Sequence, residues 1–217
     1  STQGVSSAAS DVYKRQLHFS RIVLNMVEVR IHGRGGQGVV TASDLLAFAA
    51  FEDGHCAQAF PSFGSERTGA PVVSYCRIRD TEIRTREPVL EPDLIIVQDP
   101  TLLAIMDVFS GLKPDGYALI NSTKTFDELD LNDLVNSHIP GHIRLIPATD
   151  LAFQYVGRNV PNAVLLGAVT AFTDIVSMEA VTKAIHSKFP KPIAEKNIAA
   201  AQAAAELLSH EEVHASA

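Results

Sequence analysis

The chain has no tryptophan and only two cysteines among its 217 residues. Two thiols, Cys56 and Cys76, cannot supply the four ligands of an iron–sulfur cluster. No apolar run reaches the roughly 18 residues that a membrane-spanning helix requires. Positive charge is also scarce, because 18 Lys and Arg stand against 25 Asp and Glu, for a formal net charge of −7. The sequence therefore predicts neither a nucleic-acid partner nor a membrane partner, since both require clustered basic side chains.

Metal-binding and targeting signals are equally sparse. The eight histidines are scattered, and none is spaced from another histidine and a carboxylate as in a metal site. No signal-peptide core with a cleavage site precedes the first strand pattern. Free cysteines are usual in a reducing cytosol, so we expect a cytoplasmic protein that binds no metal itself.

The composition is otherwise that of a globular protein, with 46% apolar and 20% charged residues. The length suits one α/β domain with its own core. Residues 1–25 show no strand or helix period, and we expect them to be a leader that is non-native or disordered, with Met26 as the native start. The domain is then expected over residues 26–210, followed by a C-terminal tail at 211–217.

Hydrophobic periodicity predicts strands that alternate with helices. Strands are predicted at 27–32, 56–60, 72–79, 94–97, 117–121 and 143–147. Helices are predicted at 39–52, from Asp99 through Val108, around 165–176, after an N-cap at Ser177, and at 192–208. The strand–helix–strand opening favours a parallel sheet. We predict a single doubly wound α/β domain, Rossmann-like, with a mostly parallel sheet and helices on both faces.

A glycine-rich segment joins the first strand to the first helix. It reads Gly33-Arg34-Gly35-Gly36-Gln37-Gly38 and satisfies G-x-G-x-x-G. Glycines let the backbone approach an anion, and the helix that follows presents free N–H groups and the positive end of its dipole. A phosphate or carboxylate could therefore bind at Gly35 to Gly38. The alternative is that the glycines only permit a tight turn against neighbouring backbone.

A nicotinamide enzyme would also need an acidic residue at the end of the second strand, to bind the ribose. That strand ends in Phe60-Pro61, and Glu52 and Asp53 precede it instead. The dinucleotide interpretation therefore loses its second element. A nucleotide-binding oxidoreductase of another kind and a ligand-free scaffold subunit remain as alternatives.

Three motifs together resemble one family. The glycine segment followed by Val39 resembles the G-x-G-G-Q-G-V opening of the gamma domain of 2-oxoacid:ferredoxin oxidoreductases. Phe63 to Val72 is similar to the G-x-E-R-x-G-A-P-V segment of the pyruvate and branched-chain members. Asn162 to Gly167 is similar to the family's N-x-x-x-L-G helix start. Each motif alone is weak, but their order and spacing from Met26 to Leu208 make the resemblance specific.

The resemblance implies a complex that oxidatively decarboxylates a 2-oxo acid to an acyl-CoA and reduces ferredoxin or flavodoxin. Such a complex uses thiamine diphosphate, Mg²⁺, iron–sulfur clusters and coenzyme A. This chain lacks both cluster cysteines and the G-D-G…N signature of thiamine enzymes. The alpha, beta and delta subunits are therefore expected to hold these cofactors and to pass electrons on. This chain is expected to have no catalytic residue and to be inactive alone.

The family further implies that the gamma domain covers the active site and helps to hold coenzyme A. Carried onto this sequence, the expected binding residues are Gly33, Arg34, Gly35, Gly36, Gln37, Gly38, Ser65, Glu66, Arg67, Thr68, Gly69 and Asn162. Two alternatives stay open: Glu66 and Arg67 could form a local ion pair that shapes the loop or a subunit contact, and Asn162 could be only an N-cap. Pyruvate is the expected 2-oxo acid, although the 2-oxoisovalerate, oxalate and indolepyruvate enzymes share the fold.

Overall fold

The structure is a computed structural model that describes residues 26–62 and 68–215, with side chains described as far as residue 209. The strands are β1 (Val27–Arg34), β2 (Cys56–Pro61), β3 (Pro71–Arg79), β4 (Leu94–Val97), β5 (Tyr117–Asn121) and β6 (Ile143–Ile146). The helices are α2 (Val39–Glu52), the 3-10 helix η2 (Pro100–Ala104), α3 (Asn132–Ser137), α4 (Ala148–Val156), α5 (Asn162–Phe172), α6 (Met178–Lys188) and α7 (Lys191–Ala215).

The strands form one sheet in the order β2-β3-β1-β4-β5-β6. The pairs β1–β4, β4–β5 and β5–β6 are parallel, whereas β3 is antiparallel to both of its neighbours. β1 and β2 run in the same direction, as the strand–helix–strand opening predicts, but β3 lies between them. The reason is the short connection after β2, which brings β3 back antiparallel to β2. The other edge of β3 then pairs with β1, from Val27↔Ile78 to Arg34↔Pro71.

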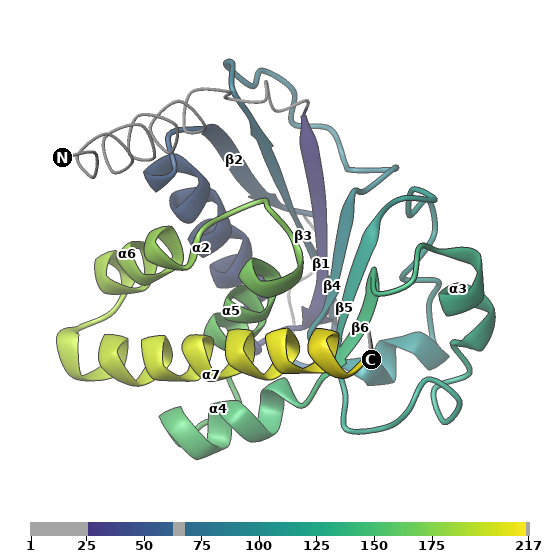
Figure 1. Ribbon diagram of the computed structural model, residues 1–217. Coiled ribbons are helices and arrows are strands. Elements are labelled where there is room, and N and C mark those ends of the chain that lie inside the picture. The colour runs from purple at the N-terminus through teal and green to yellow at the C-terminus, as the bar shows by residue number, and fades with distance from the viewer. Residues whose placement is uncertain (1–25, 63–67, 216–217) are drawn as a thin grey trace, which may run out of the picture.

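Side chains alternate between two cores, one on each face of the sheet. On β4, Leu94 and Ile96 enter the core beneath α2, α4, α5, α6 and α7, while Ile95 and Val97 enter the core on the other face. That second face carries α3 and η2 together with irregular segments (Figure 1). A strand buried on both faces explains the continuous apolar run at β4. The predicted single, doubly wound, mostly parallel α/β domain is confirmed.

Several helical regions differ from the prediction. Helix α5 ends at Phe172, short of Val176, and α7 continues to Ala215, into the segment expected as a C-terminal tail. The helix expected from Asp99 through Val108 is the shorter η2, because Ile105 already leaves helical geometry. Helices α3 and α4 were not predicted: α3 has no buried residue to create a stripe, and α4 begins at Ala148, after Pro147, without a side-chain cap. The Ser177 cap of α6 is confirmed, since its hydroxyl accepts from the Ala180 N–H at 3.1 Å.

The direction of chain winding changes between β1 and β4. From β1 the chain crosses by α2 to β2 on one side, and from β4 it crosses by η2 and α3 to β5 and β6 on the other side. The carboxyl ends of adjacent strands β1 and β4 therefore flank a switch point, where ligands of open α/β sheets bind. In the part of the chain that the structure describes, no helix is both long enough and apolar enough to span a bilayer.

Candidate functional site

The glycine segment forms the turn at the carboxyl end of β1. β1 runs two residues beyond its predicted end, so Gly33 and Arg34 belong to the strand. Gly36 and Gly38 have φ of 94° and 74°, a region that favours glycine. The Gly35 N–H donates to the Ala70 carbonyl at 2.9 Å, and Gly35 in turn accepts from the Gly69 N–H at 3.0 Å. The turn before β3 thus holds the glycine segment in place.

The N-terminus of α2 opens onto a small cavity. Gly38 is the N-cap and offers no side chain, and the first turn of α2 contains no acidic residue. The first backbone N–H to bond within the helix is that of Ala42, so the N–H groups of Val39 to Thr41 have no intrahelical acceptor. A cavity of about 240 Å³ lies at this position. It is lined by Arg34, Gly35, Gly36, Gly38, Val39, Val40, Thr41, Thr68 and Val72.

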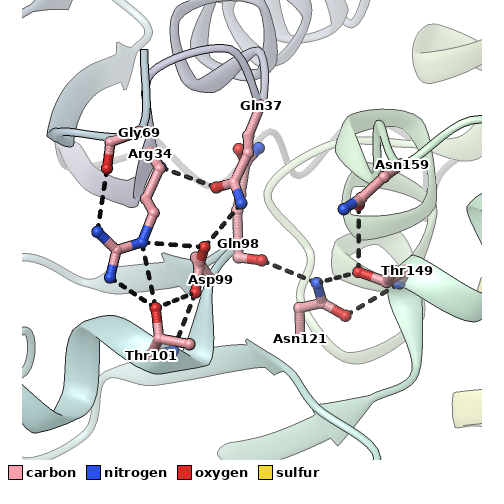
Figure 2. Close-up of polar contacts among 9 residues, drawn as sticks. All are labelled: Arg34, Gln37, Gly69, Gln98, Asp99, Thr101, Asn121, Thr149 and Asn159. Atoms are coloured by element: carbon pink, nitrogen blue, oxygen red, sulfur yellow. Dashed lines mark hydrogen bonds and ion pairs between the residues drawn. The ribbon is translucent and has the colours of Figure 1, made fainter. Parts of the chain in front are cut away.

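Arg34 joins the glycine turn to η2 (Figure 2). Its Nη2 donates to the Thr101 hydroxyl at 2.7 Å, its Nη1 donates to the Gly69 carbonyl at 3.0 Å, and its Nε lies 3.3 Å from Asp99 Oδ2. Gln37 completes the network, since its Nε2 donates to Asp99 at 2.7 Å and its Oε1 accepts from the Arg34 N–H at 2.8 Å. The guanidinium is thus paired with a carboxylate, and Arg34 positions the loop.

Asp99 is held in its ionised form at the centre of this network. Partial burial raises the pKa of the Asp99 carboxyl, but hydrogen bonds from Thr101 and Gln37, with the Arg34 charge, more than offset this effect. The net result is a pKa below the usual range. The other carboxylate oxygen caps η2 by accepting from the Thr101 N–H at 3.0 Å.

Asn162 lies against the glycine turn from the far end of the chain. It is the first residue of α5 and is 3% exposed. A Cβ added to Gly38 would lie 2.5 Å from Asn162 Nδ2, so the two residues fit only without a side chain at 38. The N-cap of α5 is Pro161, and no side chain caps this helix. The interpretation of Asn162 as an N-cap is therefore wrong.

A further set of polar groups lies at the carboxyl ends of β4, β5 and β6 (Figure 2). The Asn121 side-chain amide donates to the main-chain carbonyl of Gln98 and to the Thr149 hydroxyl, each at 2.8 Å, and accepts from the Thr149 N–H at 3.0 Å. Sequence reasoning missed these residues. The available signal was a polar residue at the carboxyl end of an apolar strand, with Gln98 directly after β4 and Asn121 as the last residue of β5, because carboxyl ends of parallel strands share one edge.

The structure brings most of the predicted site residues together at this edge. They are Gly33, Arg34, Gly35, Gly36, Gln37, Gly38, Thr68, Gly69 and Asn162. Ser65, Glu66 and Arg67 lie outside the described residues. Among the residues that are described, no group of three His, Cys, Asp or Glu is arranged to hold a metal ion. The turn thus places the free N–H groups of the first turn of α2 beside the small cavity.

Comparison with known proteins assigns this architecture to a family. The model of the family described as pyruvate ferredoxin/flavodoxin oxidoreductase matches residues 28–207, which include the glycine turn and Asn162. The chain belongs to this family. It is a gamma-type subunit of a pyruvate/2-oxoacid ferredoxin oxidoreductase, and this assignment replaces the alternative of a nucleotide-binding oxidoreductase of another kind.

The chain is similar to several proteins named as subunits of pyruvate oxidoreductases. Pyruvate synthase subunit PorC of Methanothermobacter marburgensis is 46% identical over 185 residues, covering 85% of this chain and 99% of that protein. The pyruvate/ketoisovalerate oxidoreductases common subunit gamma of Thermococcus kodakarensis is 45% identical over 179 residues, covering 82% of this chain and 95% of that protein. The crystal structure of pyruvate oxidoreductase subunit PORC of Thermotoga maritima superposes with a TM-score of 0.70 at 37% identity, covering 84% of this chain and 97% of that one.

Proposed function

We propose that this gamma-type subunit holds a phosphate of coenzyme A at the start of α2 and shapes the cover of the active site in a pyruvate-type complex. The observation that supports the proposal is the cavity at the α2 N-terminus, next to backbone N–H groups that no helical carbonyl uses. Such N–H groups and the positive end of the helix dipole bind phosphate without any cationic side chain.

The size and lining of the cavity suit one phosphate group. Ligand pockets usually exceed about 300 Å³, whereas this cavity has about 240 Å³. The rest of coenzyme A therefore extends beyond this chain, toward a partner. Gly36 and Gly38 carry no side chain that would keep the phosphate from the backbone. Arg34 forms one wall and fixes the turn through its contacts with Asp99 and Thr101.

The remaining chemistry belongs to partner chains. Thiamine diphosphate with Mg²⁺, which supplies the carbanion chemistry, and the iron–sulfur clusters are assigned to the alpha, beta and delta subunits. This chain has only two cysteines, Cys56 and Cys76, which are too few to hold an iron–sulfur cluster. Cys76 is also buried, and burial raises the pKa of its thiol. Electrons leave through the partners to ferredoxin or flavodoxin. The complex is assigned to the cytoplasm.

Pyruvate is the proposed 2-oxo acid, because of the Glu66-Arg67-Thr68-Gly69-Ala70-Pro71 segment. The choice of acid is assigned to a partner chain. The common gamma subunit of Thermococcus kodakarensis is named for both pyruvate and ketoisovalerate oxidoreductases, which supports this division. A 2-oxoisovalerate, oxalate or indolepyruvate complex is the alternative within the family.

Reconstitution tests the proposal. The isolated chain is expected to be colourless, to bind no thiamine diphosphate and to reduce no dye with pyruvate. Partner chains purified without it should gain coenzyme A-dependent pyruvate oxidation when it is added. A brown isolated chain that oxidises pyruvate would contradict the assignment of roles. If addition restores assembly but every glycine-turn variant leaves coenzyme A kinetics unchanged, the chain is a ligand-free scaffold.

A further inference from the structure

A second cavity lies on the other side of the contact between Arg34 and Thr101. Its volume is about 880 Å³, and it is formed by η2 and the residues after it, the segment from 121 to 131, and the start of α4. Thr101 lines this cavity and Arg34 lines the smaller one, so their 2.7 Å hydrogen bond is part of the wall between the two. We call the larger cavity the acidic groove, for the reasons that follow.

The base of the acidic groove is apolar and its rim is negatively charged. The apolar lining includes Leu103, Met106, Val108, Phe109 and Leu131. The carboxylates of the lining are Asp107, Glu128, Asp130 and Asp150, all exposed. None of these four lies within 4 Å of a cationic group among the side chains that the structure describes. Lys124 is the one basic residue of the lining.

One of the four carboxylates, that of Glu128, is bound by the turn before it. Hydrogen bonds from the backbone and hydroxyl of Thr125 lower the pKa of Glu128, which keeps its charge. Asp130 has φ of 56°, a left-handed conformation that aspartate tolerates better than most residues, at the end of the turn that begins at Asp127. Four negative charges against one positive charge give the rim a negative potential. A phosphorylated ligand or an acidic protein is therefore disfavoured in this groove.

We infer that the acidic groove docks a basic segment of a neighbouring subunit. Lysine and arginine carry an apolar stem and a cationic end, which match an apolar base with a carboxylate rim. Ile105, which is 60% exposed at the end of η2, adds apolar surface next to the groove. The volume exceeds what a simple cation needs, and the chain belongs to a family whose members are named as subunits. A partner segment accounts for the size, the apolar base and the charge together.

The first test reverses charge inside and outside the groove. One variant combines Asp107→Lys with Asp150→Lys, and the matched control combines Asp115→Lys with Asp133→Lys, two exposed residues outside the groove. Both variants change the net charge equally, and each replaces one aspartate in the first turn of a helix, α4 or α3. Thermal unfolding checks that both fold. If the groove variant unfolds, all four aspartates are replaced by Asn in place of Lys, in the groove variant and in the control alike.

Each chain is co-expressed with its partner subunits, and its retention in the complex is measured by gel filtration over a salt series. We expect the groove variant to lose at least tenfold in retention, the control to match the wild type, and wild-type retention to fall as salt rises. Equal retention of the groove variant and the wild type overturns the inference, and so does an equal loss in both variants.

The second test identifies the occupant. A photo-cross-linking amino acid at Thr123, an exposed residue of the lining, is activated in the assembled complex and the linked peptide is sequenced. A partner peptide that contains Lys or Arg supports the inference. An acidic peptide, or no cross-link in the intact complex, overturns it. Both tests measure assembly, so their failure is distinguishable from failure of the proposed coenzyme A site.

Discussion

Asn162 packs against Gly38 so closely that the first atom of any side chain at 38 would overlap its amide. The two residues lie 124 positions apart in the sequence, at the starts of α5 and α2. Their contact brings the glycine motif and the Asn162 motif together in the fold. Gly167, the last residue of the second motif, serves another contact, since a Cβ there would collide with the Ala201 carbonyl of α7.

The contact predicts the effect of Gly38→Ala. Alanine at 38 must adopt a φ of 74° and also displace the Asn162 amide. Gly157→Ala is the matched control, because Gly157 has a φ of 78° and nothing within 4 Å of an added Cβ. The conformational cost alone is about 1–2 kcal/mol. We expect chemical denaturation to show that cost for Gly157→Ala and an additional loss of about 1–3 kcal/mol for Gly38→Ala.

A double-mutant cycle tests the origin of that additional loss. In the Asn162→Ala background the amide is gone, so Gly38→Ala should lose little more stability than Gly157→Ala does. Equal losses from Gly38→Ala with and without Asn162 would show that the contact is not the cause.

His32 predicts a pH dependence of stability. It is 3% exposed, and burial, reinforced by the charge of Arg30, lowers its pKa to about 3. Its Nε2 also accepts a hydrogen bond from Arg30 Nε at 3.0 Å, which requires the unprotonated nitrogen. An unfolded histidine binds its proton near pH 6.5, so between about 6.5 and 3 the unfolded state binds one proton more. The free energy of unfolding should therefore fall as pH falls through this window, by about 1.4 kcal/mol per pH unit.

His32→Gln provides the comparison, since glutamine keeps an acceptor for Arg30 but does not titrate. The free energy of unfolding, measured by denaturation from pH 7 to pH 4.5, should fall more steeply for the wild type. The difference in slope should correspond to about one bound proton. Parallel curves for the two proteins would show that His32 is protonated in the folded state at these pH values.

Arg67→Ala tests the segment that the sequence, and not the structure, places in the site. Loss of a charge-assisted bond to phosphate costs about 1.5–3 kcal/mol. We expect the Michaelis constant for coenzyme A to rise by about one to two orders of magnitude in the assembled complex. The constant for the 2-oxo acid should change little. A variant that lowers complex yield and shifts both constants together would indicate that Arg67 acts at a subunit interface.

The sequence predicted those elements that have a strong local pattern. The alternating residues of β1, the apolar run of β4 and the cap at Ser177 each have a local physical cause. The insertion of β3 between β1 and β2 was not predicted, because strand order depends on pairing between distant segments. The shortening of the helix after Asp99 also had no sequence signal.

The candidate site, too, was predicted only where it has a local sequence pattern. Glycines between a strand and a helix indicate an anion-binding turn without further information. The pairing of Arg34 with Asp99 and Thr101 could not be predicted, because it depends on β1 and β4 being adjacent. Sequence reasoning therefore counted Arg34 among the expected coenzyme A-binding residues but did not predict that its guanidinium binds Asp99, Thr101 and the Gly69 carbonyl.

The most direct test of the coenzyme A site places a negative charge at the mouth of the smaller cavity. Val40 lines this cavity in the first turn of α2, where aspartate stabilises a helix. Val40→Asp should therefore fold well but repel a phosphate, and Val40→Asn has the same shape without the charge. At about 5 Å and an effective dielectric constant of about 20, the repulsion is about 3 kcal/mol.

The measurement is the Michaelis constant for coenzyme A and for pantetheine, which has no phosphate, in complexes assembled with each variant. The account predicts that Val40→Asp has a coenzyme A constant about 100 times that of Val40→Asn, while the two variants have equal constants for pantetheine. Equal coenzyme A constants in the two variants would contradict phosphate binding at the start of α2.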